Sequence, residues 1–149
     1  MAHTAQSRNV HLFDSWPGLP NPSEEDGKGA DAWAGDAMGS TRRVSAIMKK
    51  LGVDPSRLHF YRGWFQDTFP KARIGKIALL HIDADFYDSV KLCLERWFPH
   101  VSSGGIIQFD DYDSYLGCRT AVDQFLSAHP ELTLSSSGSV APVRWIEKP

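Results

Sequence analysis

The chain has 149 residues, of which 42% are hydrophobic and 11% aromatic, and its 16 basic and 18 acidic residues give a formal net charge of -2. That composition provides the core of one domain and excludes intrinsic disorder of the whole chain. We expect neither nucleic acid nor a membrane as partner, and we expect a soluble cytoplasmic protein, because the sequence has no basic block, no apolar run near the roughly 20 residues of a membrane span, and no secretory signal.

The first predicted strand covers residues 9–13, and Asp14 follows it directly. A single carboxylate at such a strand end can accept hydrogen bonds from the vicinal hydroxyls of a ribose, and a turn or helix cap is the alternative. Residues 17–36 then contain few apolar side chains. This segment is far longer than the usual connection of about 4–6 residues. A loop of this length is typical of a lid or a disordered segment. Within it, Trp33 either contacts a ligand or packs on its own domain.

A helix is predicted over residues 37–51 because apolar side chains recur at helical spacing and Gly52 follows as a stop. A strand over residues 57–61 leads to an aromatic segment, residues 63–70, that is predicted to be a loop or a short helix. Trp64 and Phe65, beside Gly63, can flank a flat ring of a ligand, and packing in the core is the alternative.

The second half of the chain alternates between predicted strands and helices. The expected strands cover residues 74–82, 104–109, 132–136 and 143–146, and the expected helices cover residues 86–98 and 115–128. This alternation predicts an α/β sheet that is largely parallel, with an antiparallel pair at its end.

Two of these strands end in carboxylates. Asp83 follows the first, and Asp110 and Asp111 follow the second. Adjacent parallel strands would bring the three acids together at one sheet edge, where they would raise one another's pKa unless a cation neutralised them. Oxygen ligands predict a hard cation, Mg²⁺ first and Ca²⁺ or Mn²⁺ next. The alternative is capping and surface roles, which fit Asp85 and Asp88 well.

Cys93 and Cys118 are the only cysteines, and neither has a metal-ligand or Cys-x-x-Cys spacing. We expect Cys93 to be a buried reduced thiol, because it falls on the apolar side of a predicted helix. The sequence leaves the environment of Cys118 open, and neither cysteine favours a redox or zinc function.

Five segments resemble motifs of the macrocin O-methyltransferase family, which includes the TylF, MycF and NovP types. They are residues 12–20 (LFDSWPGLP), 60–70 (FYRGWFQDTFP), 82–89 (IDADFYDS), 103–112 (SGGIIQFDDY) and 118–125 (CRTAVDQF). The resemblance covers nearly the whole chain from about residue 9. It implies a Rossmann-like class I methyltransferase sheet with flanking helices.

The resemblance also implies a reaction and its residues. Family members transfer a methyl group from S-adenosylmethionine to a sugar hydroxyl of a small natural product, with Mg²⁺ at the acceptor. Carried over, Asp83, Asp110 and Asp111 are the expected metal ligands, and Asp83 is the first candidate for general base. Asp14 is the expected ribose ligand, and Gly63, Trp64 and Phe65 are expected to bind the cofactor. The lid-like loop at residues 17–36 would close over the acceptor.

The chain is expected to be N-terminally truncated relative to this family, because residues 1–8 cannot supply the strand and glycine-rich turn that hold the methionine end of the cofactor. We therefore expect weak or absent cofactor binding by this chain alone. One alternative is a non-catalytic fragment or a subunit completed by a partner, and a homo-oligomer is left open. A second is a Mg²⁺-dependent phosphatase of the haloacid dehalogenase type, because Asp83-Ala84-Asp85 imitates its nucleophile and acid.

Overall fold

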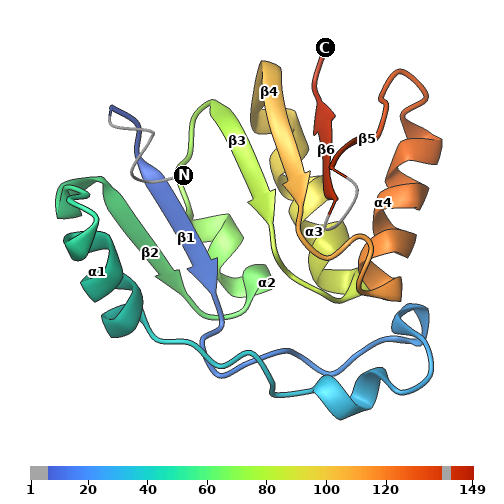
Figure 1. Cartoon of the computed structure of the whole chain (residues 1–149), viewed down its shortest axis with the longest axis horizontal. Helices are drawn as coiled ribbons and strands as arrows, with labels where there is room; N and C mark the ends of the chain where they lie inside the picture. Colours follow the sequence, from blue (N-terminus) through green and yellow to red (C-terminus); the bar gives the residue numbers. More distant parts are fainter. Residues whose placement is uncertain (1–6, 139–141) are drawn as a thin grey trace. The chain divides into compact units, whose positions relative to one another are not determined.

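The computed structural model describes residues 7–138 and 142–149, which fall into two compact units. The first unit comprises Met1–Gly18 and Gly35–Ala72, and the second comprises Leu19–Ala34 and Arg73–Pro149. The lid-like segment predicted from the sequence therefore belongs mostly to the second unit. The colours of Figure 1 follow the chain from β1 in blue to β6 in red.

The first unit is built on two parallel strands, β1 (Val10–Asp14) and β2 (Leu58–Arg62), which pair in register along their whole length. Helix α1 (Thr41–Lys50) precedes β2, and the short helix α2 (Phe65–Thr68) follows it. Aromatic rings of the strands pack together. Phe13 stacks on Tyr61 with 4.2 Å between ring centroids and meets Phe69 edge-on at 5.0 Å. The predicted strands and the short helix are thus confirmed, with small changes at their ends.

The second unit contains a four-stranded sheet in the order β3, β4, β6, β5. Strands β3 (Ile77–Ile82) and β4 (Val101–Phe109) run parallel, whereas β6 (Val143–Glu147) runs antiparallel to both β4 and β5 (Ser135–Ser137) (Figure 1). The parallel pair and the antiparallel end predicted from the alternation are confirmed. The final strand pair is shifted, because the predicted strand at residues 132–136 forms only from Ser135 onward.

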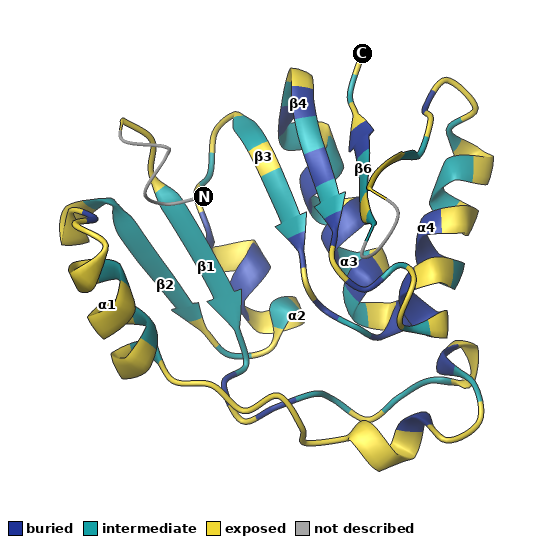
Figure 2. Cartoon of the chain, in the orientation of Figure 1, coloured by how far each residue is buried: buried dark blue, intermediate teal, exposed yellow. Residues whose placement is uncertain are grey.

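Two helices, α3 (Tyr87–Trp97) and α4 (Leu116–Ala128), pack against each other and complete the core of the second unit. Figure 2 shows their buried faces in dark blue. The side chains that are 0–2% exposed come from both helices and from the sheet: Ile82, Phe86, Val90, Leu94, Trp97, Val101, Ile107, Phe109, Cys118, Val122 and Ile146. Burying one such aliphatic or aromatic side chain contributes about 1.5–3 kcal/mol. Across the described part of the chain, every helix is too short or too polar to cross a bilayer.

Within the described ranges, the edge strands of the two sheets are β1 and β2 in the first unit and β3 and β5 in the second. Among the described residues, β1 pairs only with β2, and β3 pairs only with β4. An unpaired strand edge leaves a row of backbone N–H and C=O groups without ladder hydrogen bonds.

Candidate functional site

The ends of β3 and β4 lie level with each other. Ile82, the last residue of β3, pairs with Phe109, the last residue of β4. The backbone N–H of Asp110 donates a hydrogen bond of 3.0 Å to the carbonyl of Ile82. Asp83 and Asp110 therefore leave the sheet at the same level, as the two strand-end motifs predicted.

Three carboxylates meet just beyond this edge. Oxygens of Asp83, Asp85 and Asp111 all lie within 4.8 Å of one another. Asp83 is exposed, Asp85 is half-buried, and Asp111 is only 8% exposed. Asp110 is exposed and lies outside this group of three, which we call the acidic cluster. The ligand set Asp83, Asp110 and Asp111 remains a prediction, and the geometry adds Asp85 to it.

Asp85 owes its place in the acidic cluster to a sharp turn of the backbone. Its φ of +53° lies in the left-handed region, which aspartate tolerates better than most residues. Its N–H donates a hydrogen bond of 3.3 Å to Oδ2 of Asp111, which ties the two strand ends together. Sequence reasoning gave Asp85 a capping role. The signal that could have identified it is its position two residues after another strand-end acid.

Burial and mutual repulsion raise the proton affinity of the acidic cluster. Burial is the larger cause at Asp85 and raises its pKa to about 7, with Asp111 and Asp83 adding to the shift and a hydrogen bond from Tyr115 opposing it. Burial also raises the pKa of Asp111, with Asp83 adding, whereas the N–H of Asp85 opposes the change. Crowded carboxylates with only oxygen donors fit a hard divalent cation, which would offset this repulsion.

The two thiols lie in the core of the second unit. Cys93 and Cys118 are both free and buried. Burial raises the pKa of both thiols, that of Cys118 to about 12, where Asp111 and Asp85 add to the shift. A thiol that keeps its proton is a poor nucleophile and a poor metal ligand. The prediction of a buried reduced Cys93 is confirmed, and Cys118 shares that environment.

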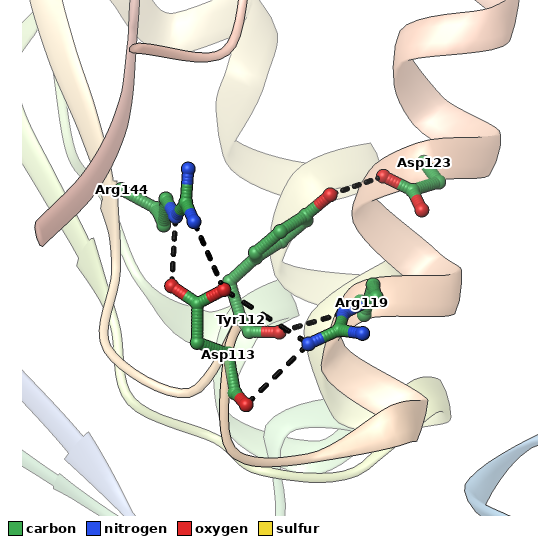
Figure 3. A network of polar contacts seen from close by, with 5 residues as sticks. All are labelled: Tyr112, Asp113, Arg119, Asp123 and Arg144. Carbon is green, nitrogen blue, oxygen red and sulfur yellow. Dashed lines mark hydrogen bonds and ion pairs between the residues drawn. The ribbon is translucent and has the colours of Figure 1, made fainter. Parts of the chain in front are cut away.

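A polar network fixes the loop that follows Asp111 (Figure 3). Arg144 on β6 forms a two-pronged pair with Asp113, with its Nε at 2.7 Å from Oδ2 and its second nitrogen at 3.1 Å from Oδ1. Arg119 on α4 donates to the carbonyls of Tyr112 and Asp113 at 3.2 and 3.4 Å. The loop is therefore held from β6 on one side and from α4 on the other.

Tyr112 completes this network. Its hydroxyl donates a hydrogen bond of 2.7 Å to Oδ1 of Asp123 on α4. The guanidinium groups of Arg119 and Arg144 lie over its ring, 5.5 and 5.6 Å from the centroid. Because Tyr112 directly follows Asp111, each of these contacts restrains the backbone that presents the most buried carboxylate of the acidic cluster.

Replacing Arg144 by glutamine is expected to weaken the binding of Mn²⁺ to the acidic cluster by about 10-fold. Side chains that hold metal ligands in place typically affect metal affinity by about 10–100-fold, and Asp113 is two residues from Asp111, so the lower value applies. Electron paramagnetic resonance of free Mn²⁺ measures the affinity. Arg42→Gln, which removes an exposed arginine of α1, is the matched control. Equal affinities of both variants and the parent chain would contradict this role of Arg144.

Asp14, the predicted ribose ligand, lies at the end of β1 in the first unit. Its Oδ1 accepts a hydrogen bond of 2.6 Å from the N–H of Trp16. Asp14 therefore caps a turn, as the alternative prediction from the sequence stated. Beside it, the Trp16 side chain is only 7% exposed, and its Nε1 has no hydrogen-bond partner among the described residues. The N–H of Gly63 donates to the carbonyl of Asp14 at 3.0 Å. The structure thus brings Asp14 and Gly63 together.

The aromatic residues after Gly63 differ in their environment. Trp64 is 40% exposed. Phe65 stacks on Phe69, with 4.8 Å between ring centroids and 11° between the ring planes, which is the core-packing alternative. Gly63 itself has a φ of +130°, a conformation that favours glycine. Trp64 is thus the aromatic side chain of this segment that offers most surface to a ligand, and the cofactor-binding role of all three residues stays a prediction.

The model of the family described as Macrocin-O-methyltransferase (TylF) matches residues 1–134. This chain belongs to the macrocin O-methyltransferase family. The resemblance drawn from the five motifs is thereby confirmed, and the phosphatase alternative is wrong. Among curated relatives, demethyldecarbamoylnovobiocin O-methyltransferase of Streptomyces niveus is 31% identical over 135 residues, which are 83% of this chain and 49% of that protein.

Another macrocin O-methyltransferase family relative, mycinamicin III 3''-O-methyltransferase of Micromonospora griseorubida, is 30% identical over 86% of this chain and 53% of its own length. The chain thus spans about half the length of the curated relatives that it matches. The solved structure of the O-methyltransferase NovP superimposes with a TM-score of 0.81 at 28% identity, over 99% of this chain and 63% of NovP. The structure of the calicheamicin methyltransferase CalS11, at 22% identity and a TM-score of 0.74, covers 97% of this chain and 62% of its own and confirms the methyltransferase fold.

Proposed function

We propose that this chain serves an S-adenosylmethionine-dependent O-methyltransferase that methylates a sugar hydroxyl of a glycosylated natural product. Family membership supports the methyl transfer. The names of three relatives support the acceptor class. Two are the relatives described above, named for demethyldecarbamoylnovobiocin and mycinamicin III, and the third is 8-demethyl-8-(2,3-dimethoxy-alpha-L-rhamnosyl)-tetracenomycin-C 4'-O-methyltransferase of Streptomyces olivaceus. The observation that carries the proposal is the acidic cluster, in which two adjacent parallel strands present carboxylates within 4.8 Å of one another.

Asp83 and Asp111 of the acidic cluster would hold Mg²⁺ together with either Asp85, the third member of the cluster, or the neighbouring Asp110. When bound there, the ion would supply a Lewis acid that lowers the pKa of an acceptor hydroxyl. The chain's own part is to keep three acids close despite their repulsion. The N–H of Asp85 does this by donating to Asp111, and the network around Asp113 does it by restraining the following loop.

Asp83 and Asp85 are the two candidates for taking the proton of the acceptor hydroxyl. Asp83 is exposed and so accessible to an acceptor. Asp85 is half-buried, and a hydrogen bond from the Tyr115 side chain partly offsets the rise of its pKa. A general base must lie within hydrogen-bond reach of the proton that it takes. We keep Asp83 as the first candidate because of its exposure and add Asp85 as the second.

The end of β1 fits a polar ligand such as the nucleoside part of the methyl donor. Asp14 uses Oδ1 for Trp16, which leaves Oδ2 as an acceptor for a ribose hydroxyl. The buried Nε1 of Trp16 is a donor without a partner in the described structure. A buried donor without a partner costs about 1–3 kcal/mol, so a ligand acceptor there would be favourable. Trp64 adds an exposed indole on the same unit.

Methyl transfer from labelled S-adenosylmethionine to a glycosylated aminocoumarin or macrolide, with Mg²⁺ or with a chelator, tests the proposal. We expect transfer that depends on Mg²⁺ and falls at least about 100-fold in Asp83→Asn, because that substitution removes both a ligand and the first candidate base. Asp88→Asn removes an exposed acid of α3 outside the acidic cluster and is the matched control.

Calorimetry with S-adenosylmethionine separates the proposal from its alternative. Binding of the donor with transfer to a sugar hydroxyl supports an enzyme. Binding without transfer to any hydroxyl acceptor, or transfer that survives both the chelator and Asp83→Asn, would contradict the proposed reaction. Absence of donor binding would favour the alternative that this chain alone is non-catalytic and requires a partner.

A further inference from the structure

Asp26 is a buried acid in the middle of the lid-like segment. It is only 9% exposed, whereas its neighbours Glu24 and Glu25 are exposed. Its Oδ2 accepts hydrogen bonds from the N–H and the hydroxyl of Ser23, at 2.7 and 3.0 Å. Those contacts are local and close the 3-10 turn Glu24–Asp26. They leave Oδ1 for a partner elsewhere in the second unit.

That partner is the start of α3. Oδ1 of Asp26 accepts a hydrogen bond of 2.7 Å from the N–H of Tyr87, which is 61 positions away in the sequence. Helix α3 has no side-chain cap of its own, because Phe86 occupies its N-cap position. A carboxylate at a helix N-terminus satisfies a free N–H and interacts favourably with the helix dipole. Asp26 thus caps α3 from a distant segment.

The start of α4 is shaped to receive the same carboxylate. A Cβ atom added to Gly117 would overlap Oδ1 of Asp26 and approach the N–H of Tyr87 to 2.7 Å. Gly117 is buried and lies in the first turn of α4. Only glycine leaves room for Asp26 between the two helix starts, so the contact depends on a residue from each of three elements.

The other end of the segment approaches the acidic cluster by a second route. The ring of Trp33 meets the ring of Tyr115 edge-on, with 6.5 Å between centroids, and the Tyr115 side chain hydrogen-bonds to Asp85. Tyr87, which Asp26 caps, is two residues from Asp85. Both contacts of the segment therefore lead to the carboxylate whose place in the acidic cluster rests on a left-handed turn.

We propose that Asp26 is a positioning residue that docks Leu19–Ala34 onto the starts of α3 and α4 and thereby fixes Asp85 in the acidic cluster. The part concerning the acidic cluster rests on the proposed function, because it assumes that a cation binds there. The docking itself stands on the contacts of Asp26 alone. The Trp33 ring makes the intra-unit contact with Tyr115 that the packing alternative predicts, but Trp33 is also 50% exposed, so contact with a ligand stays a prediction.

Two measurements on the full chain test this role. Amide hydrogen exchange of Tyr87 and of residues 19–34 reports docking, and electron paramagnetic resonance of free Mn²⁺ reports the acidic cluster. In Asp26→Ala we expect exchange of the Tyr87 amide to rise at least about 10-fold and Mn²⁺ affinity to fall about 10-fold, the lower end of the range for side chains that hold metal ligands in place. Glu25→Ala removes the adjacent exposed acid and should leave both readouts unchanged.

A second variant keeps the docking role testable if Asp26→Ala fails to fold. Asp26→Asn keeps an acceptor for Tyr87 but turns an amide donor toward Ser23, so its exchange should fall between those of the parent and Asp26→Ala. Unchanged exchange in both variants would overturn the docking role. Increased exchange with unchanged Mn²⁺ affinity would overturn the positioning of Asp85. A parent chain that binds no Mn²⁺ would refute the metal site of the proposed function, while the exchange result would still decide the docking.

Discussion

Replacing Asp111 by alanine is expected to lower the affinity of the chain for Mn²⁺ or Mg²⁺ by at least about 100-fold. Asp111 is the most buried member of the acidic cluster, and burial together with Asp83 raises its pKa, so its ionised form lacks a compensating positive charge in the described structure. Losing a ligand carboxylate should cost more than the roughly 10–100-fold lost with an outer partner. Calorimetry with each cation, or electron paramagnetic resonance of free Mn²⁺, measures the change.

Two further substitutions decide which acids bind the cation. The sequence motifs predict that Asp110→Ala weakens binding as strongly as Asp111→Ala, whereas the distances in the structure predict the larger loss for Asp85→Ala. Asp88→Ala, an exposed acid at the start of α3, is the control and should not change the affinity. Equal cation affinities of the parent and Asp111→Ala would show that the acidic cluster is not a cation site.

The sequence predicted the strand ends of the candidate site for a local reason. Apolar runs that end in acids are visible without knowledge of the fold, and parallel pairing then places Ile82 opposite Phe109. Asp85 was missed because its role depends on a left-handed backbone turn and on a hydrogen bond to Asp111, 26 positions away. Neither feature leaves a periodic signal in the sequence.

The observed ends of helices and strands differ from the predicted ends where the backbone makes a turn that the pattern of side chains does not encode. Helix α1 starts at Thr41 and not near residue 37, because Ala37 has a φ of +61° and Ser40 caps the helix through the N–H of Arg43. Strand β4 begins at Val101, before the predicted start at Gly104. The glycine has a φ of +72° and donates its N–H to Lys148, and the pairing with β3 shifts register there.

The composition of the lid-like segment predicted its loop structure but not its buried acid. Its many polar residues predicted a long loop, and that is how it runs between the 3-10 turns Glu24–Asp26 and Ala30–Trp33. Composition gave no sign that one of its acids is buried. Asp26 differs from Glu25 only through contacts with Tyr87 and Gly117, which come from two other elements. Such a long-range contact can be seen only in the folded chain.

Replacing Asp85 by asparagine is expected to stabilise the chain above about pH 7 in the absence of divalent cations. The folded chain raises the pKa of Asp85 to about 7, whereas an unfolded aspartate has a pKa of about 3.9. Between these values the folded state holds the extra proton, so the free energy of unfolding falls as the pH rises. The shift corresponds to at most about 4 kcal/mol, and solvent screening of this half-buried group reduces it to about 2 kcal/mol.

Denaturant unfolding at pH 4.5 and pH 8 measures this effect. The parent should lose stability between the two values, and Asp85→Asn should lose much less, with a remainder from Asp111, whose pKa is also raised. Asp88→Asn, the exposed control, should follow the parent. If the free energy of unfolding changed equally with pH in the parent and in Asp85→Asn, the neighbours of Asp85 would not destabilise its ionised form. Adding Mg²⁺ at pH 8 should then stabilise the parent more than Asp85→Asn, because the cation relieves the repulsion that the substitution has already removed.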